Sequence, residues 1–486
     1  MHLSRRKFFT LAATSAAGTA LLSPLEAFYA RASRGQSLKT KGYGSLQPQL
    51  PQNVRELPGE YQKPLIALPP QFQYTAFSIT GQPMTDGNPV PGDHDGMAAF
   101  PGAGGLIYLV RNHELSPDED EFPAIVPAGY GYDPFANGGT TTLVIGRDRR
   151  LIKDMVSLGG TYRNCSGGPT PWNTWITCEE NTSKPGNVEV ADPEGGGEPD
   201  DPQERRSVRL PDQDIVSVEH GYNFEVDPKK GLVKAEAIKA MGRFNHEAIA
   251  VDSRTGIVYQ TEDRGDSVFY RYIPNEPGNL LAGGSLEALG IQGKPGIETA
   301  VGFPLNTPFP VVWIPLEDVE SPEDNLRKQA AEKGAAIFTR EEGIAYDPLN
   351  GEVFFCCTDG GEKELGQIWR YVPDETNQTG GTIELFVEPN DQEVLDAPDN
   401  ITVSPFGDLF TCEDGEGTDR INGITPDGLL YEFIRNNINN REFAGVTFSP
   451  DGQTMFFNIQ DPGITFAVWG PWQKVAQLSR HRARLS

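Results

Sequence analysis

Residues 340–361 read REEGIAYDPLNGEVFFCCTDGG, and this stretch contains the pattern that decides the fold. A polar opening leads into a short apolar strand, a turn of Asp, Pro, Asn and Gly, and a second strand that ends in acidic residues. Turns of this composition favour a tight connection between antiparallel strands. The stretch therefore predicts a β-hairpin whose two polar ends lie at one level.

The same unit recurs five more times along the chain, at 94–114, 164–180, 245–264, 398–415 and 441–463. Repeated β units of this kind indicate a propeller, in which the inner strand of each blade lines a central channel. We expect an all-β, six-bladed β-propeller with acidic loop insertions. The opening and closing residues of all units should then gather at one end of the channel.

Acidic and amide side chains recur at these two positions. The opening residues are Asp95, Cys165, Glu247, Glu342, Asn400 and the region of Glu442; the closing residues are Asn112, Glu179/Glu180, Glu262/Asp263, Asp359, Glu413/Asp414 and Gln460/Asp461. One such acid is also typical of a plain turn, but the recurrence favours a shared role. Clustered carboxylates raise one another's pKa unless cations lie among them. Oxygen-rich sites select Ca²⁺, Mg²⁺ or Fe³⁺.

Cys165 occupies an opening position, within NCSGG, where other units place Asp or Glu. A thiolate there would be a soft ligand for a redox-capable metal such as iron, and a buried structural thiol is the alternative. Cys178, Cys357 and Cys412 directly precede or flank closing acids, and we interpret them as core thiols. The chain has five cysteines, so at least one thiol stays outside any disulfide.

Arg340 and Arg264 are cations placed beside the acids. A guanidinium fork suits a phosphate group, and an ion pair with the neighbouring acids is the alternative. His94, His113 and His246 fall in the same segments; we interpret them as packed neighbours, with metal ligation and acid/base chemistry as alternatives. The sequence has no G-x-S-x-G, H-E-x-x-H or Walker motif.

Residues 1–32 predict an export signal. Arg5 and Arg6 in SRRKFF precede an Ala-rich apolar stretch, and small residues near Ala30 resemble a cleavage site. Consecutive arginines indicate the twin-arginine export machinery. The apolar stretch is short for a membrane helix, so we expect no membrane insertion and a periplasmic or extracellular location.

The formal net charge of −27 excludes nucleic acid as an expected partner. It also opposes binding of a phosphate ester unless cations lie among the carboxylates. After the signal, we expect an extended lead-in over 33–65 and one propeller domain over 66–486. Within that domain, 191–214 predicts an acidic loop and 316–335 a short surface helix.

Taken together, the motifs resemble the PhoX family of alkaline phosphatases. The resemblance rests on SRRKFF (4–9), RNHE (111–114), NCSGGPTPWNTWITCEE (164–180), GRFNHEAIAVD (242–252), TEDR (261–264), REEGIAYD (340–347) and APDNITVSPFGDLFTCEDG (397–415). It implies a six-bladed propeller that holds two ferric ions and calcium ions, and phosphomonoester hydrolysis outside the cytoplasm.

By motif position, the resemblance implies iron ligation by Cys165, Glu247 and Glu342, and phosphate binding and catalysis by Arg340. The remaining polar residues would serve calcium: Asp95, Asn112, Glu180, Glu262, Asp263, Asp399, Asn400 and Glu413. We expect Arg264 to bind substrate as well, and a monomer that hydrolyses small phosphate esters with metal assistance. A calcium-dependent propeller hydrolase of lactones or other esters and a non-catalytic calcium-binding propeller are the alternatives.

Overall fold

The computed structural model describes residues 39–117, 122–185, 188–189, 207–208, 216–374 and 380–472. The chain divides after Leu38 into two units, and the described residues all belong to the unit that begins at Lys39. The predicted export signal at 1–32 therefore lies outside the described residues, as does the predicted acidic loop at 191–214 except for 207–208. No helix within the described ranges is long and apolar enough to cross a membrane.

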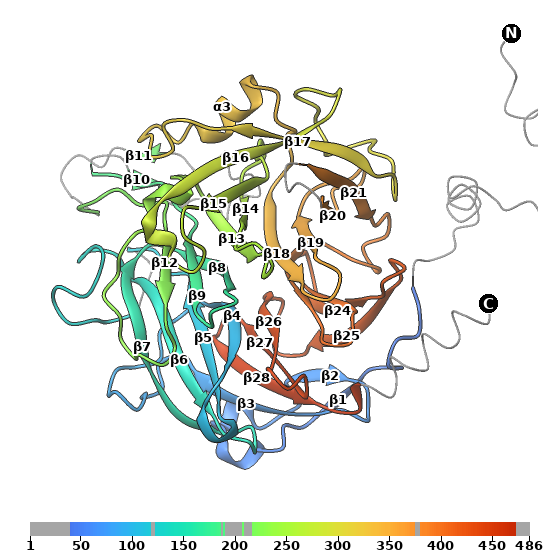
Figure 1. The fold of residues 1–486 in the computed structure, drawn as a ribbon. Helices are drawn as coiled ribbons and strands as arrows, with labels where there is room; N and C mark the ends of the chain where they lie inside the picture. Colours follow the sequence, from blue (N-terminus) through green and yellow to red (C-terminus); the bar gives the residue numbers. More distant parts are fainter. Residues whose placement is uncertain are drawn as a thin grey trace, which may run out of the picture. The chain divides into compact units, whose positions relative to one another are not determined.

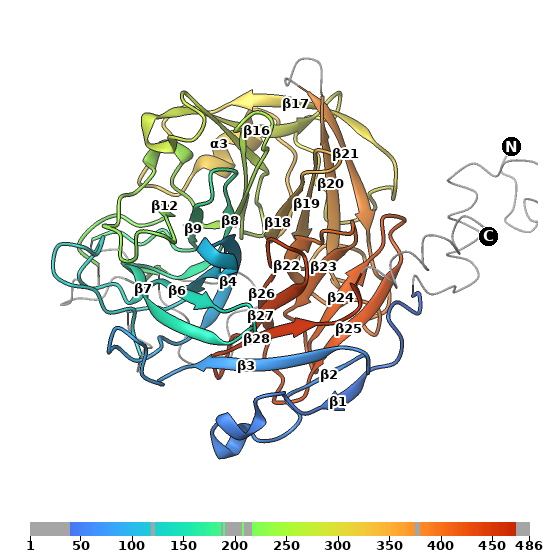
Figure 2. The same ribbon diagram turned by 60° about the horizontal axis from the view of Figure 1, so that its bottom comes forward.

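Antiparallel strands surround a centre, and the described residues form an all-β, propeller-like fold (Figures 1 and 2). Six inner strands contact one another in a closed ring. In ring order they are β4 (His94–Pro101), β8 (Asn164–Pro169), β13 (His246–Val251), β18 (Glu341–Asp347), β22 (Pro398–Val403) and β26 (Phe443–Phe448). The prediction of an all-β, propeller-like fold is confirmed.

Each inner strand begins an antiparallel meander that runs outward. The strands that follow the inner ones are β5 (Ile107–His113), β6 (Gly138–Ile145), β7 (Leu151–Thr161), β9 (Trp175–Glu179), β12 (Asn223–Val226), β14 (Val258–Glu262), β15 (Tyr270–Pro274), β16 (Gly284–Ile291), β19 (Glu352–Cys357), β20 (Gln367–Pro373), β21 (Gly381–Val387), β23 (Leu409–Glu413), β24 (Arg420–Ile424), β25 (Leu430–Asn436), β27 (Thr454–Ile459) and β28 (Ile464–Trp469). Strand β17 (Phe309–Pro315) pairs with both β16 and β21, so two meanders form one nine-stranded sheet. Strands β10 (Val188–Glu189) and β11 (Ser207–Val208) pair separately.

An early strand of the chain and its last described strand pair in one sheet. Strand β3 (Gln73–Ile79) pairs with β28, from Ile464 opposite Ile79 to Trp469 opposite Gln73. Figure 1 shows this pairing as a blue strand beside a red one. The sheet that begins with β26 is therefore completed by β3, a strand from the N-terminal part of the chain.

Part of the predicted lead-in at 33–65 also joins a sheet. Strand β1 (Gln47–Gln49) pairs with β2 (Ile66–Leu68), which pairs with the outer strand β25. The lead-in thus covers the outer edge of the meander that begins with β22.

Small residues let the inner strands approach one another closely. A Cβ atom added at Gly343 of β18 would lie 2.6 Å from the backbone oxygen of Asp399 on β22. At Gly96 of β4 it would lie 2.6 Å from the Cα atom of Ser166 on β8. Such distances leave no room for a side chain, so glycine at these two positions is required for the observed spacing.

Aromatic side chains fill much of the space between the sheets. Phe72 and Trp472 pack edge to face with ring centroids 4.6 Å apart, and Phe410 and Phe433 belong to the same buried cluster. Edge-to-face packing is a favoured geometry for aromatic rings. This core holds the closing sheet of β26, β27, β28 and β3 against the meander of β22.

The predicted surface helix within 316–335 is present as α3 (Leu326–Glu332). Its residue Arg327 forms ion pairs with Asp266 at 2.6 Å, Asp324 at 3.0 Å and Glu262 at 3.4 Å. These contacts attach the insertion to the meander that begins with β13. The 3-10 helices of the described residues are Val54–Glu56, Gly59–Tyr61, Ala103–Gly105, Lys239–Met241 and Leu280–Ala282.

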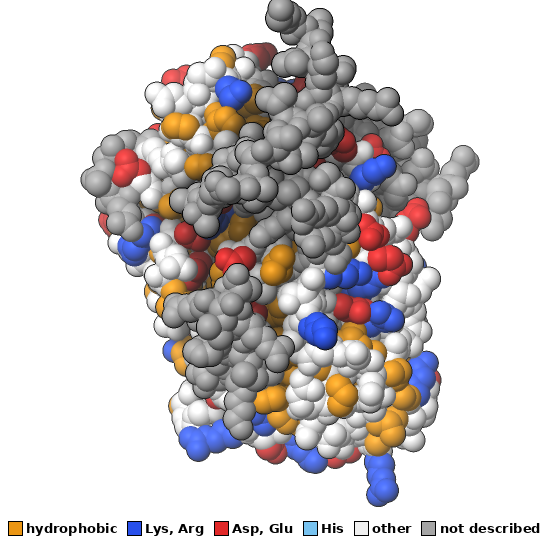
Figure 3. All heavy atoms as spheres, turned by 90° about the vertical axis from the view of Figure 1, so that its right-hand side faces the viewer, with side chains coloured by type: hydrophobic (Ala, Val, Ile, Leu, Met, Phe, Trp, Pro, Cys, Tyr) orange, Lys and Arg blue, Asp and Glu red, His pale blue; other side chains and the backbone are white. Residues whose placement is uncertain are grey.

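Figure 3 shows one face of the molecule, on which acidic, basic and hydrophobic side chains are interspersed. The visible part of this face is neither uniformly acidic nor uniformly basic.

Candidate metal centre

Five inner strands share an irregularity immediately after their first paired residue. On β13, His246 pairs with Glu262 and Ile249 pairs with Gln260. Two residues of the inner strand thus lie between these pairs, opposite a single residue of its neighbour β14. This is a β-bulge, which redirects side chains locally. The same shift occurs on β4, β8, β18 and β22. The residues at the first bulged position, called the ring residues below, are Asp95, Cys165, Glu247, Glu342 and Asp399.

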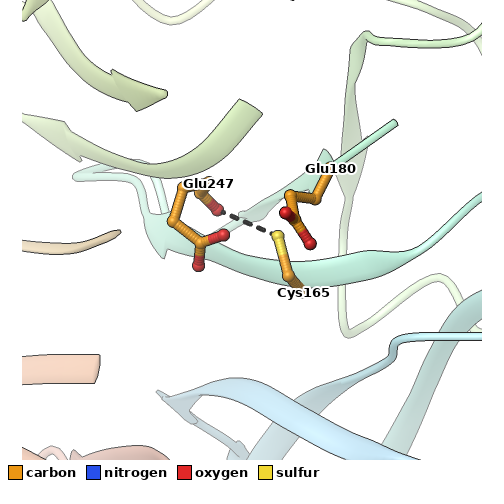
Figure 4. Close-up of side chains that lie close together, drawn as sticks. All are labelled: Cys165, Glu180 and Glu247. Atoms are coloured by element: carbon orange, nitrogen blue, oxygen red, sulfur yellow. Dashed lines mark hydrogen bonds between the residues drawn. The ribbon is translucent and has the colours of Figure 1, made fainter. Parts of the chain in front are cut away.

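Two groups of ligand atoms meet at the centre. Cys165, Glu180 and Glu247 offer atoms that all lie within 4.8 Å of one another, and we call them the thiol triad. Figure 4 shows the Cys165 sulfur lying between the two carboxylates. Glu247, Glu342 and Asp399 form a second group with the same spacing, the carboxylate triad. Glu247 belongs to both, so the two groups form one continuous cluster.

The cluster resists ionisation in the absence of cations. Burial raises the pKa of Glu247 well above its usual value, and the charges of Asp399 and Glu180 raise it further. Burial and then the charge of Asp414 raise the pKa of Asp399 to about 7. The pKa of the Cys165 thiol is also raised well above normal, by burial and by Glu247. Bound cations would reverse these shifts by favouring the charged forms.

The Cys165 thiol is oriented by the adjacent inner strand. It donates to the backbone carbonyl oxygens of His246 at 3.4 Å and Glu247 at 3.5 Å. Asn112, predicted as a calcium ligand, instead secures the backbone behind the thiol: its Nδ2 donates to the carbonyl oxygens of Cys165 and Ser166, and its Oδ1 accepts from Trp175. The amide nitrogen of Asn112 is therefore held by the backbone of β8, and its oxygen by the Trp175 indole of β9.

Two arginines border the cluster. Arg340 donates to both carboxylate oxygens of Asp263 at 3.1 and 3.2 Å and to Glu342 at 2.8 Å. Arg163 bridges Glu114 and Glu180, with its Nη2 atom 3.1 Å from the Glu180 carboxylate. Both guanidinium groups thus touch a member of one triad and an acid from the preceding meander.

Glu262 and Glu413 were predicted as ligands, but the structure turns their side chains into the sheets. The Tyr270 hydroxyl donates to Glu262 at 2.6 Å, and the Asn422 amide donates to Glu413 at 2.7 Å. Each is the last residue of the second strand, whose side chain alternates away from the centre. The neighbouring residues Asp263 and Asp414 carry charges that act on the cluster instead.

Arg264 and Asn400 also have partners different from those predicted. Arg264 lies 3.8 Å from Asp324, which precedes α3, and its role in substrate binding stays a prediction. Asn400 donates to the Ser166 hydroxyl at 3.1 Å, a contact between β22 and β8. The strand register places Asp399, not Asn400, at the ring position.

The other residues predicted for the ring lie at the centre. Asp95, Cys165, Glu247 and Glu342 occupy equivalent bulged positions, and Glu180 joins the thiol triad. Asp263 reaches the cluster through Arg340. Asp359 differs, because its carboxylate accepts from the Thr339 hydroxyl at 2.6 Å.

The sequence pattern gave no site role to Glu114 and Arg163; it named Asp414 only as a closing residue paired with Glu413, and Glu442 only as a region. Burial and then Asp414 raise the pKa of Glu442, and Glu114 raises the pKa of Asp95 after burial does. Glu114 and Asp414 each follow the last residue of a second strand, which is also the place of Glu180. That shared offset is the signal that could have identified Glu114 and selected Asp414 over Glu413.

The three histidines are packed neighbours, as interpreted from the sequence. The imidazole of His94 contacts Arg111, that of His113 contacts the carbonyl oxygen of Gly92, and that of His246 contacts the carbonyl oxygen of Gly242. Burial lowers the pKa of His246 to about 3. All three are fully buried.

The donor set fits metal ions. A buried sulfur with two carboxylates suits a borderline-soft ion such as iron, whereas the oxygen-only triad suits a hard ion such as calcium or ferric iron. The neighbouring carboxylates also raise one another's pKa, and bound cations would offset this effect.

A family model described as alkaline phosphatase PhoX matches residues 56–463. Among solved structures, PhoX of Pseudomonas fluorescens in complex with vanadate, a transition-state analogue, aligns over 84% of this chain and 96% of its own, with TM-score 0.63 and 19% identity. That similarity shows a shared fold. A gluconolactonase from Xanthomonas campestris aligns over 82% of this chain and 90% of its own, with TM-score 0.38 and 12% identity. No curated protein sequence matches this chain.

Proposed function

The chain belongs to the PhoX family of alkaline phosphatases, and on this basis we propose that it hydrolyses phosphate esters at the two triads. It is a metal-dependent phosphoric monoester hydrolase. The finer proposal is that Cys165, Glu247 and Glu342 hold iron and that Asp95, Glu180, Asp263 and Asp399 contribute to calcium sites. The family match favours this reading over a lactone hydrolase or a non-catalytic propeller.

The observation that carries the proposal is the thiol triad. The buried thiol of Cys165 on β8 lies between the carboxylates of Glu180, which follows β9, and Glu247 on the adjacent inner strand β13, and its pKa is strongly raised. Such a group is costly to ionise alone, and a cation would stabilise the thiolate. Glu247 extends the same cluster to the oxygen-only triad, so sites of different softness adjoin each other.

The bound metal ions would supply positive charge for the phosphoryl oxygens and lower the pKa of an attacking water molecule. The chain itself orients the ligands: the bulges place the ring residues at equivalent positions of the inner strands, four of them belong to the two triads, and Asn112 fixes the backbone of Cys165. Preorganised groups need little rearrangement during the reaction. The fixed backbone is therefore part of the proposed catalytic apparatus.

Arg340 is the proposed phosphate-binding residue. Its guanidinium is held by Asp263 and Glu342, beside the carboxylate triad. A planar fork of donors matches phosphoryl oxygens, and it can stabilise the negative charge that develops during hydrolysis. The two acids would keep the side chain in place between turnovers.

Further parts of the proposal concern assembly and location. The closed ring of six inner strands supports a propeller of six blades. The SRRKFF segment supports export through the twin-arginine machinery to the periplasm or beyond. We propose a monomer that acts on small phosphate esters.

The test is p-nitrophenyl phosphate hydrolysis by metal-replete protein and by two isosteric variants. Glu247→Gln should reduce kcat/KM by roughly a hundredfold or more, because Glu247 belongs to both triads. Glu384→Gln is the matched control: this acid is also buried, but it pairs with Arg370 at 2.6 Å on an outer strand. Equal activity of the two variants would show that hydrolysis occurs elsewhere.

A further inference from the structure

Arg163 and Arg340 occupy equivalent backbone positions in two meanders. Each stands two residues before a ring residue, Cys165 and Glu342 respectively, and their φ angles are 46° and 41°. The backbone N–H of each donates to the preceding meander: Arg163 to the carbonyl oxygen of Leu115 at 3.2 Å, and Arg340 to that of Arg264 at 2.9 Å. Left-handed backbone is uncommon for residues other than glycine, and here it recurs at the corresponding positions of two further meanders, Asp93 and Ala397, with φ angles of 39° and 44°.

Their carbonyl groups are equivalent as well. The carbonyl oxygen of Arg163 accepts from the N–H of Glu180 at 2.9 Å, and that of Arg340 accepts from the N–H of Thr358 at 3.0 Å. Each donor directly follows the last residue of a second strand. The backbone therefore presents both arginine side chains in the same way relative to their own inner strands.

The side chains make matching contacts. Arg163 joins Glu114 of the preceding meander to Glu180 of its own, and Arg340 joins Asp263 of the preceding meander to Glu342. Glu180 belongs to the thiol triad and Glu342 to the carboxylate triad. The two guanidinium groups thus border the two triads separately. Both side chains are largely buried, with 10% and 17% exposed.

Five meanders carry ring residues. In three consecutive ones, the residue two positions before the ring residue has a side chain that can donate hydrogen bonds. Asn245 stands two residues before Glu247, between Arg163 and Arg340 in ring order. Its amide is fully buried, and neither its oxygen nor its nitrogen has a hydrogen-bond partner within the described ranges. The corresponding residues of the other two meanders are Asp93 and Ala397, which offer no side-chain donor when Asp93 is ionised.

From this arrangement we propose that Arg163 is a second substrate-binding residue, which contacts phosphoryl oxygens from the side of the thiol triad. Arg340 contacts them from the side of the carboxylate triad. This inference rests on the proposed function, because it needs a phosphate ester at the cluster. Two guanidinium groups suit a phosphoryl group, whose several oxygens accept donors from different directions. The acids that hold Arg163 and Arg340 would keep both forks oriented before substrate arrives.

The test separates substrate binding from structural support. Arg163→Ala and Arg163→Lys are compared with wild type in three measurements: metal content by elemental analysis, the dissociation constant of inorganic phosphate by calorimetry, and kcat and KM with p-nitrophenyl phosphate. Arg370→Lys is the control, because Arg370 also pairs with a buried acid, but on outer strands.

We expect Arg163→Ala to keep the wild-type metal content and to weaken phosphate binding by at least about tenfold. Arg163→Lys should recover only part of the affinity, because lysine lacks the planar fork. Added guanidinium ion should partly restore phosphate binding to Arg163→Ala and leave Arg370→Lys unchanged.

The inference is overturned if metal-replete Arg163→Lys and Arg163→Ala bind phosphate like wild type, or if phosphate affinity falls only in proportion to lost metal. Should Arg163→Ala not fold, the lysine variant alone decides between these results. Failure of the proposed function looks different, because wild-type protein would then show neither metal-dependent hydrolysis nor loss of hydrolysis in Glu247→Gln.

Discussion

The Cys165 thiol donates to the backbone carbonyl oxygen of Glu247 across 3.5 Å, and this contact joins the ring residues of two adjacent inner strands. Neither residue could adopt this relationship within an isolated hairpin. It requires the bulge on each strand and the close packing of one inner strand against the next. The site is therefore a product of the ring, and changes to the ring should affect it.

Close packing of the inner strands predicts a strong effect of Gly343→Ala. The new Cβ atom would lie 2.6 Å from the backbone oxygen of Asp399, which cannot move like a flexible side chain. We expect a loss of about 1–3 kcal/mol in the free energy of unfolding, measured by urea denaturation, together with weaker metal binding. Gly59→Ala is the control, since nothing lies within 4 Å of its added Cβ. Equal stability of the two variants would contradict the packing account.

His220 predicts a dependence of stability on pH. It is fully buried, with Nδ1 2.7 Å from Glu179 and Nε2 3.3 Å from Asp133. Burial opposes its charge, but the two carboxylates prevail and raise the pKa of His220 from 6.5 to about 9.

Because the folded pKa exceeds the unfolded one, His220 contributes its full stabilisation below about pH 6.5 and loses it as the pH rises to about 9. The contribution amounts to about 3 kcal/mol. Urea denaturation across this range should show falling stability for wild type and a flatter profile for His220→Gln. Parallel profiles would mean that other groups cause the dependence.

Removal of metal ions should destabilise the protein. The two triads hold buried acids whose pKa values are raised by one another, and bound cations would compensate their charge. We expect a chelator to lower Tm, and added calcium together with iron to restore it. The shift should be smaller in Glu247→Gln, which lacks the acid shared by both triads. A chelator shift of equal size in that variant would place the relevant metal outside the triads.

Local pattern was sufficient to predict the hairpins and most ring residues. The turn in 347–351, for example, connects β18 and β19 as its Asp, Pro, Asn and Gly indicate. Cys165 stood out because a thiol replaced an acid at a repeated position. These features depend on neighbours within about twenty residues, which the sequence displays directly.

The sequence pattern could not show which member of each adjacent acidic pair faces the centre of the ring. Glu262 and Asp263 are adjacent, yet one turns into its sheet towards Tyr270 and the other pairs with Arg340. Strand alternation and the bulge register decide which one faces the centre. The position of Arg163 at the site could not be predicted from its neighbours in sequence, because its partner Glu114 is 49 residues away and belongs to another meander.

The most direct measurement is elemental analysis of the purified protein beside Cys165→Ala, with Cys357→Ala as a second buried-thiol control. We predict iron and calcium in wild type and in Cys357→Ala, and loss of iron with retention of calcium in Cys165→Ala. Phosphatase activity should fall together with the iron. Wild-type protein without iron, or Cys165→Ala with undiminished iron and activity, would contradict the account.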